Sequence, residues 1–236
     1  GRMLFTSYMK RFFPAVRKAK ELLPRLGHVT SVYCRTYQGL SGHDAHTGPI
    51  PSAFVPGPDG QVPILKMAGG GVLVCGGSHI FDLLLYLLGE PVAVFGRRFI
   101  RPESPQVDIM FHALMDLPDG GVVHFEGNLH PLRKIGFERR GWDEGFEISG
   151  VDGRLVLQTP VWCEPEHNAA RVSFYDNRAG TWTDFAFDVV DPFVEAEKHF
   201  LARLEAGEQG EFDRYQGYRV DYLIETAWRS AAAVRS

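Results

Sequence analysis

Residues 69–89 have the sequence GGGVLVCGGSHIFDLLLYLLG, and the fold of the chain depends on them. No proline interrupts their apolar residues, which suffice for a helix of roughly four to five turns. Polar or reactive residues recur at i, i+4, i+7 and i+11 and so share one face of that helix: Cys75, His79, Asp82 and Tyr86. The stretch therefore predicts a core helix that carries a single polar stripe.

Two glycines, Gly76 and Gly77, fall inside this helix. Because an interior glycine costs about 1 kcal/mol relative to alanine, we expect another backbone or a flat ligand to approach the helix there. The polar stripe has two interpretations. His79 is either a reactive imidazole that faces a site or a satisfied core histidine paired with Asp82, and periodicity does not decide between them.

The composition limits the partners of the chain. Of its 236 residues 44% are hydrophobic, which suffices for one large domain or two small ones. The formal net charge of −4, with acidic and basic residues interspersed, argues against nucleic acid and an anionic membrane as partners. We expect no membrane span, because glycine and histidine interrupt the longest apolar run. Three cysteines, Cys34, Cys75 and Cys163, argue against a disulfide framework and favour a reducing cytoplasm.

The elements on either side of the central helix differ in kind. Before it, the pattern predicts a short buried strand at 3–8, a helix at 14–23, a strand at 28–37 and a long functional or oligomer-contacting loop at 39–63. After it, alternating segments joined by short turns predict successive antiparallel strands at 91–100, 107–116, 121–129, 145–149, 154–158, 171–175 and 181–187.

The chain ends in helices. Asp191 is expected to cap the first of them and Asp213 the second. The helical spacing predicts a buried aromatic stripe on each: Phe193 with Phe200, and Tyr218 with Tyr222. The predicted fold class is therefore α+β, with a large, mostly antiparallel open sheet and helices on one face.

The sequence holds no strong cofactor or metal motif. The glycines at 69–71 do not follow a strand that opens a βαβ unit, so a dinucleotide fingerprint is absent. A P-loop and a Gly-x-Ser-x-Gly elbow are also absent. Residues 42–46 (GHDAH) could offer metal ligands from a polar loop, and Cys34, Cys75 and His79 could converge on zinc. Neither set has the spacing of a strong zinc site, so no metal is predicted.

The stretch 69–89 resembles the signature helix of the Gfo/Idh/MocA oxidoreductases, the family of glucose-fructose oxidoreductase and inositol dehydrogenase. Residues 3–13 are similar to the family's last Rossmann strand and the Arg-Phe-Pro type motif that follows it. Residues 22–33 are similar to the crossing helix and first sheet strand, 148–157 to the G-x-x-G hairpin, and 213–230 to the closing helix. The resemblance implies a C-terminal domain with a large open antiparallel sheet, which in the family follows a Rossmann domain.

The resemblance also implies a site. In the family, a histidine on this helix and a lysine from a Glu-Lys-Pro motif flank the substrate carbinol, and hydride passes to or from a nicotinamide. His79 matches that catalytic histidine, Asp82 matches the structural aspartate three residues later, and Cys75 stands where an aspartate is usual. The Glu-Lys-Pro segment is absent from this chain. An imidazole with an ordinary pKa near 6.5 suits proton exchange with a hydroxyl.

Two of these matches leave alternatives open. A thiol is mostly neutral at pH 7 and accepts hydrogen bonds weakly, so Cys75 cannot replace a carboxylate that holds an imidazolium. Either His79 is oriented otherwise in this protein, or the chemistry differs. Asp82 either pairs with His79 or caps neighbouring backbone. We count Cys75 and Asp82 as candidate substrate-binding residues.

Four further residues are candidates through the resemblance. Lys10 and Arg11 match a basic pair that in the family lies near the nicotinamide, so they are candidate cofactor-binding residues, the alternative being a solvated helix start. Arg140 and Trp142 lie in RRGWDEGFE, which in the family can contribute to the substrate mouth. We count both as substrate-binding candidates, although a structural role is an equal alternative for Trp142.

We therefore expect residues 1–26 to be the remnant of the last Rossmann strand and the crossing helix. Residues 27–236 would be the substrate-binding and oligomerisation domain of an NAD(P)-dependent oxidoreductase that acts on a sugar, a polyol or a related CH–OH group. NAD or NADP would bind the full-length protein and not bind this chain alone tightly. The sheet face would join copies into a homodimer or tetramer. The alternative is a non-enzymatic sugar-binding or dimerisation module.

Overall fold

The computed structural model describes residues 3–39, 48, 52–130, 142–160, 170–210 and 215–235. The helices are η1 (Met9–Phe12), α1 (Pro14–Leu22), η2 (Leu23–Leu26), η3 (Ser52–Phe54), α2 (Pro63–Ala68), α3 (Val72–Leu88), α4 (Pro192–Ala206) and α5 (Gln216–Ser230). The strands are β1 (Val29–Gly39), β2 (Ala93–Arg101), β3 (Ser104–Asp116), β4 (Val122–His130), β5 (Trp142–Gly150), β6 (Gly153–Thr159), β7 (Arg171–Asp176), β8 (Thr181–Phe185) and β9 (Ala232–Arg235). The α+β class is confirmed.

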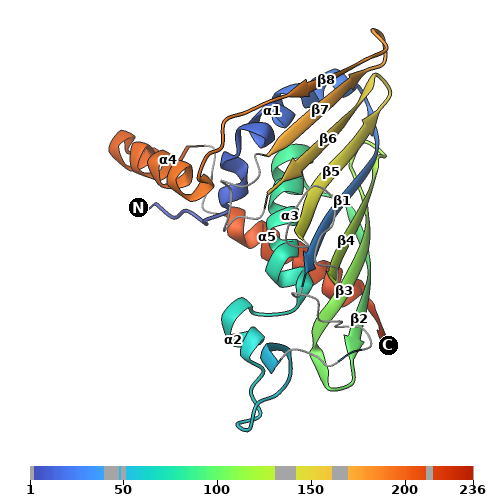
Figure 1. Ribbon diagram of the computed structural model, residues 1–236, viewed down its shortest axis with the longest axis vertical. Coiled ribbons are helices and arrows are strands. Elements are labelled where there is room, and N and C mark those ends of the chain that lie inside the picture. The colour runs from blue at the N-terminus through green and yellow to red at the C-terminus, as the bar shows by residue number, and fades with distance from the viewer. Residues whose placement is uncertain are drawn as a thin grey trace.

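The described strands form one open sheet in the order β8-β7-β6-β5-β1-β4-β3-β2-β9 (Figure 1). The predicted hairpins pair antiparallel, from β2 through β4 and from β5 through β8. At the centre, however, β1 is antiparallel to β5 and parallel to β4, and at one edge β9 is parallel to β2. The sheet is therefore mixed, which corrects the expectation of a mostly antiparallel sheet. The long connection from β1 to β4 allows the parallel pairing, which a short turn cannot make.

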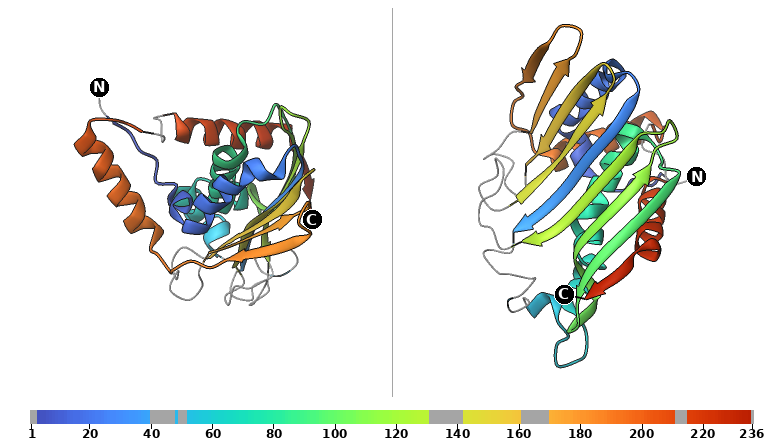
Figure 2. Two further views of the ribbon diagram at one scale, coloured as in Figure 1. Left: turned by 90° about the horizontal axis from the view of Figure 1, so that it is seen from above. Right: turned by 90° about the vertical axis from the view of Figure 1, so that its right-hand side faces the viewer.

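The helices α1, α3 and α5 lie on one face of the sheet, and the other face is bare in the described chain (Figure 2). The central helix α3 has 17 residues, about 26 Å in length, and packs against β1, β3 and β4. Its side chains Leu73, Ile80 and Leu84 are fully buried there. The sequence prediction of a core helix at this position is confirmed.

Residues 63–88, which comprise α2 and α3, are long and apolar enough to span a membrane. The sequence interpretation, that glycine and histidine interrupt this run too early, did not foresee this. In the structure 61% of the apolar 18-residue stretch within this range is buried inside the protein, because α3 packs against the sheet. A buried core helix of a globular domain can be equally long and apolar, so this property does not indicate a membrane span here.

Residues 3–8 do not form the strand that their apolar pattern predicted. No described strand lies beside them, and Leu4 is 59% exposed. The side chain of Gln209 instead hydrogen-bonds both the N–H and the C=O of Leu4. An apolar segment without a neighbouring strand has no ladder to join, so the strand prediction is wrong for these residues.

The first terminal helix begins as predicted, but the expectation that the chain ends in a helix is wrong, because α5 ends at Ser230 and is followed by the strand β9. The aromatic stripes of the two helices are also not buried as expected. Asp191 caps α4 by accepting hydrogen bonds from two backbone N–H groups, whereas Asp213 lies outside the described residues. On α5, Tyr218 and Tyr222 are 65% and 63% exposed, because that helix buries its opposite face against α3. On α4, Phe193 is 37% exposed. The core prediction is wrong for these three side chains.

Candidate functional site

Asp108 of β3 holds the first turn of α3. Its Oδ2 accepts a hydrogen bond of 2.8 Å from the backbone N–H of Leu73. A side chain at Gly71 would collide with the backbone of Asp108, so helix and strand meet closely here. Burial raises the pKa of Asp108 to about 6, because hydrogen bonds from the backbone offset only part of the lost hydration.

Gly76 brings β1 close to the turn of α3 that carries Cys75 and His79. A Cβ at position 76 would collide with Nε2 of Gln38 and Oγ1 of Thr36. Both side chains are buried on the inward face of β1. A close neighbour is therefore present at this glycine, but it consists of polar side chains of the sheet and not of the backbone or flat ligand that was expected.

His79 lies in the middle of α3, mostly buried but with part of its surface exposed. Its ring meets the ring of Tyr8 edge-on, with 5.7 Å between centroids. Nδ1 is buried and has no hydrogen-bond partner among the described residues. Burial, and then the positive charge of Lys10, lower the pKa of His79 to about 3. At neutral pH the ring is therefore uncharged, and it is a weaker base than the ordinary imidazole assumed from the sequence.

Asp82 binds partners from two other elements. Its carboxylate accepts hydrogen bonds from Nε and Nη2 of Arg11, at 2.8 and 2.6 Å, and from Nε2 of Gln216 at 2.7 Å. Burial raises the pKa of Asp82, while the Arg11 guanidinium acts against that rise. The sequence left His79 and neighbouring backbone open as partners, and the structure gives Asp82 an arginine of η1 and a glutamine of α5 instead.

Lys10 is 1% exposed, and its ammonium forms an ion pair with Glu144 of β5, which is fully buried. Oε1 of Glu144 also accepts a hydrogen bond of 2.8 Å from Oγ1 of Thr36. The two candidate cofactor-binding residues, Lys10 and Arg11, thus both bind acidic side chains inside the domain. The cofactor role of these two residues stays a prediction.

The other candidate residues are placed less completely. Cys75 is half-buried; burial raises the pKa of its thiol, and Gln38 and Lys10 act in the opposite direction. Trp142 begins β5 directly across from Gln38 on β1, and its Nε1 is buried without a hydrogen-bond partner among the described residues. Arg140 lies outside the described residues. The substrate-binding roles of all of these residues stay predictions.

The sequence analysis did not single out Glu144, Gln38 or Asp108. A signal was present for Glu144: it shares the inward phase of β5 with Phe146 and Ile148, so it is a charged residue at an apolar position of an alternating strand. A buried charge requires a partner, and the partner of Glu144 comes from a distant segment.

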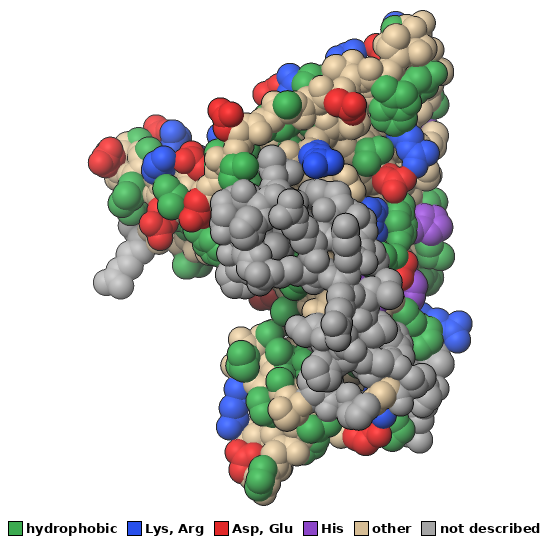
Figure 3. Space-filling model, in the orientation of Figure 1, with side chains coloured by type: hydrophobic (Ala, Val, Ile, Leu, Met, Phe, Trp, Pro, Cys, Tyr) green, Lys and Arg blue, Asp and Glu red, His purple; other side chains and the backbone are tan. Residues whose placement is uncertain are grey.

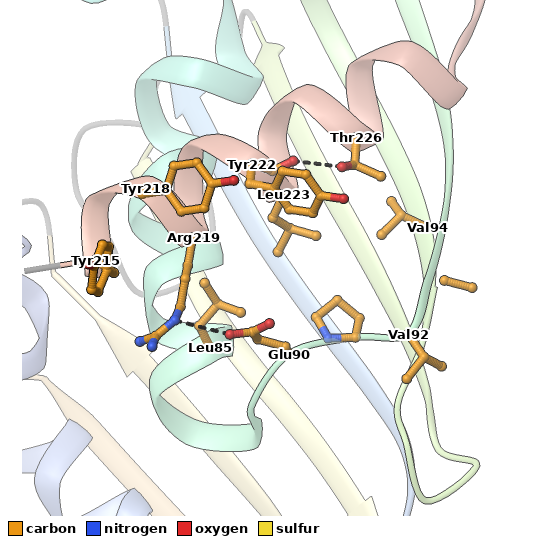
Figure 4. A pocket seen from close by; sticks show the side chains of 12 residues that line it. Leu85, Glu90, Val92, Val94, Tyr215, Tyr218, Arg219, Tyr222, Leu223 and Thr226 are labelled. Carbon is orange, nitrogen blue, oxygen red and sulfur yellow. Dashed lines mark hydrogen bonds and ion pairs between the residues drawn. The ribbon is translucent and has the colours of Figure 1, made fainter. Parts of the chain in front are cut away.

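A groove of about 560 Å³ runs between α5, the end of α3 and the residues that lead into β2 (Figure 4). Tyr218 and Tyr222 line it from α5, and Arg219 beside them forms an ion pair of 3.1 Å with Glu90. None of the predicted site residues lines this groove. Among the described residues, no group of three or more His, Cys, Asp and Glu side chains is arranged to hold a metal ion.

A family model described as the GFO/IDH/MocA C-terminal domain matches residues 16–156, which is more than half of the chain. The chain belongs to the Gfo/Idh/MocA family. The match runs from α1 into β6 and contains the site residues His79, Asp82 and Glu144.

Individual relatives in the Gfo/Idh/MocA family match over parts of their length. The scyllo-inositol 2-dehydrogenase (NADP(+)) IolW of Bacillus subtilis (strain 168) is 30% identical over 78 residues, which are 33% of this chain and 22% of that protein. Levoglucosan dehydrogenase, solved with NADH and L-sorbose, has a TM-score of 0.71 at 18% identity, over 95% of this chain and 62% of that one. UDP-N-acetylglucosamine 3-dehydrogenase GnnA from Acidithiobacillus ferrooxidans has a TM-score of 0.68 at 16% identity, over 97% of this chain and 61% of that one.

These likenesses support the family fold. The chain spans about a fifth of the curated relative and about three-fifths of the two solved chains. The NAD(P)-dependent oxidoreductases among its relatives therefore contain sequence that has no counterpart in this chain.

Proposed function

We propose that this chain is the C-terminal, substrate-binding and oligomerisation domain of an NAD(P)-dependent oxidoreductase that acts on a sugar, a polyol or a related CH–OH group. The observation that carries the proposal is the state of His79, which lies on the helix within the family match. Its imidazole is uncharged, and its buried Nδ1 has no hydrogen-bond partner in the part of the chain that the structure describes. An uncharged ring keeps a lone pair that can accept a hydrogen bond from a substrate hydroxyl. For His79 to act as the base, the binding of substrate and cofactor would have to raise its pKa toward neutrality.

In this proposal the nicotinamide cofactor is bound by a separate nucleotide-binding domain of the full-length protein. Residues 1–26 would join that domain to residues 27–236. The helix α4 lies beside the N-terminal segment and projects from the sheet (Figure 2), with Leu201 60% and Leu204 53% exposed. In the full-length protein, that nucleotide-binding domain would cover these apolar side chains.

The residues of this chain then have separate roles. His79 accepts the hydroxyl proton, and Asp82 with Arg11 holds the helix that carries His79 against η1. Cys75 lies one turn before His79 and, with Arg140 and Trp142, would line the substrate mouth. A thiol at position 75 is neutral at physiological pH, so we propose that it contributes shape and not charge.

We also propose that the bare face of the sheet joins two copies of the chain. In the space-filling view, which shows the sheet from the side, histidine and hydrophobic side chains are visible along the right-hand edge (Figure 3). A shallow cleft of about 450 Å³ on the sheet is lined by Tyr33, Phe95, Arg97, His112, Leu114 and His124. Phe95 and Leu114 are 63% and 46% exposed, which is an apolar surface that a second copy would cover.

Two experiments test the proposal. The natural reading frame upstream of residue 1 should encode a glycine-rich βαβ unit and a Glu-Lys-Pro segment; a start codon directly before this chain would support the non-enzymatic module instead. The complete protein should then reduce NAD or NADP with a member of a panel of hexoses and inositols. No turnover with any of them, in either direction, would contradict the proposed function.

A further inference from the structure

The inner face of the sheet becomes polar beside the first half of α3. Two neighbouring rows of cross-strand partners form this polar floor: Gln38 with Trp142, and Thr36 with Glu144 and Thr159. The next row along the same strands is apolar and fully buried: Cys34, Phe146 and Leu157. Burying polar groups is unfavourable unless they are paired, so the packing of a core does not explain the polar floor.

Two N–H groups of the polar floor are buried without an acceptor. Gln38 is 6% exposed, and its Nε2 has no hydrogen-bond partner among the described residues. Nε1 of Trp142, directly opposite on β5, is likewise buried and unpaired in the described chain. Residues directly opposite in an antiparallel pair have Cβ atoms about 5 Å apart, so one small molecule can reach both donors. Because a buried donor without an acceptor is costly, two of them side by side indicate that a ligand supplies the acceptors.

The amide of Gln38 lies against the turn of α3 that carries Cys75 and His79. A Cβ on Gly76 would fall on Nε2 of Gln38, so the amide reaches the helix only because position 76 has no side chain. Gln38 also lowers the pKa of the neighbouring Cys75 thiol, but sulfur is a weak acceptor and Nε2 forms no hydrogen bond with it. A ligand bound by Gln38 would therefore lie next to the turn of His79, whose buried Nδ1 is also unpaired in the described part of the chain.

We propose that Gln38 and Trp142 are specificity-determining residues that donate hydrogen bonds to two oxygens of one substrate, next to the carbon that reacts at His79. The inference rests on the proposed function and narrows its substrate class. Both N–H groups can only donate, so the ligand must present acceptor oxygens, as the hydroxyls of a cyclic polyol or a sugar ring do. An alcohol with a single hydroxyl would leave donors of the polar floor unpaired, and a site rejects a ligand that leaves its buried polar groups without partners.

Deoxy analogues test these hydrogen bonds one at a time in the complete protein. Gln38→Met removes the N–H donors and keeps the length of the side chain, and Trp142→Phe removes the indole N–H and keeps an aromatic ring. With the hexose or inositol that is turned over, we expect each variant to lower kcat/KM about 10- to 100-fold, the loss of one buried hydrogen bond. For each variant, one monodeoxy analogue should show the same loss with wild type and no further loss with that variant. Gln106→Met, at an exposed glutamine of β3, is the matched control and should behave as wild type does.

A loss that is equal with the parent compound and with every deoxy analogue would show that these side chains act only on the fold, and it overturns the inference. So do wild-type values of kcat/KM in both variants.

Binding provides a readout that does not require turnover. Saturation-transfer difference NMR on the complete protein, with D-glucose, D-galactose, myo-inositol and scyllo-inositol as probes, should show at least one of them bound by wild type and bound more weakly by Gln38→Met and Trp142→Phe. Equal binding by all three proteins, or binding of none of the four probes, overturns the inference. The proposed function fails separately, if a probe binds through Gln38 and Trp142 but no hexose or inositol is turned over with NAD or NADP in either direction.

Discussion

Arg11, on the η1 helix that leads into the domain, binds both carboxylate oxygens of Asp82 at the middle of α3, at 2.8 and 2.6 Å. The side chain of Gln216, at the start of α5, binds the same carboxylate at 2.7 Å. Three elements that are distant in sequence thus meet at one buried acid. This contact fixes the helix that carries His79 relative to the segment that enters the domain.

Breaking this contact from one side should be costly. Arg11→Met leaves the Asp82 carboxylate buried without its cation, and we expect the free energy of unfolding to fall by about 3–5 kcal/mol. Urea unfolding measures the change. Lys198→Met is the control, because it breaks an exposed pair with Glu195 on α4 and should cost less than about 1 kcal/mol. Equal losses in the two variants would contradict the role given to Asp82.

Asp108 should make the domain less stable as pH rises. Its pKa in the folded chain is about 6, above the ordinary 3.8, so the folded state binds this proton more tightly than the unfolded state. The resulting stabilisation is present below about pH 4 and is lost as pH approaches 6, which amounts to about 3 kcal/mol. Asp108→Asn keeps an oxygen for the Leu73 N–H and cannot titrate. Its stability relative to wild type should rise between pH 4 and pH 6; a constant difference would refute the assignment.

His79 should have the opposite pH dependence. Its pKa in the folded chain is about 3, below the ordinary 6.5, so the unfolded chain binds the proton more tightly. Stability is therefore lost as pH falls from about 6.5, by roughly 2 kcal/mol on reaching pH 5. Chemical unfolding of His79→Gln should show less loss on acidification than wild type. His28→Gln, at an exposed histidine, should behave as wild type does, and identical acid losses in all three proteins would count against a buried neutral ring.

The two glycines inside α3 should respond differently to a methyl group. In Gly76→Ala the new Cβ collides with Gln38 and Thr36, and we expect overpacking to cost about 1–3 kcal/mol. In Gly77→Ala the nearest atoms are 3.3 Å away, and alanine gains helix propensity, so the change should be close to neutral. Thermal unfolding of both variants distinguishes them. A larger loss in Gly77→Ala would show that the approach of β1 to the helix is misplaced.

Local patterns predicted the strands of the hairpins and the central helix well, because each depends on nearby residues, but they missed β9 and placed a strand at 3–8 where none forms. Alternation and turn residues such as 118–120 located the strands of the hairpins, and the apolar run after Gly71 located α3. The position of β1 was not predictable in the same way, because its pairing with β4 joins segments separated by three helices (η3, α2 and α3) and a hairpin. A period of two sets the buried face of a strand but not its neighbour.

The candidate site was predictable only in part. The helical face with Cys75, His79 and Asp82 follows from spacing, yet the partner of Asp82 comes from η1 and that of Lys10 from β5. Such contacts depend on how distant elements pack. Tyr218 and Tyr222 on α5 had the spacing of a buried stripe, but the face opposite to them is the one that packs against α3.

The most direct test of the account is the turnover of the complete protein with His79 replaced. His79→Ala should lower kcat by a factor of about 10² to 10⁴, the usual loss when a general acid or base is removed. Ser78→Ala, at the adjacent half-buried position, removes only a hydrogen bond of 3.0 Å to the Cys75 carbonyl and should stay within a few-fold of wild type. A kcat for His79→Ala that equals that of Ser78→Ala would contradict the assignment of His79 as the proton acceptor.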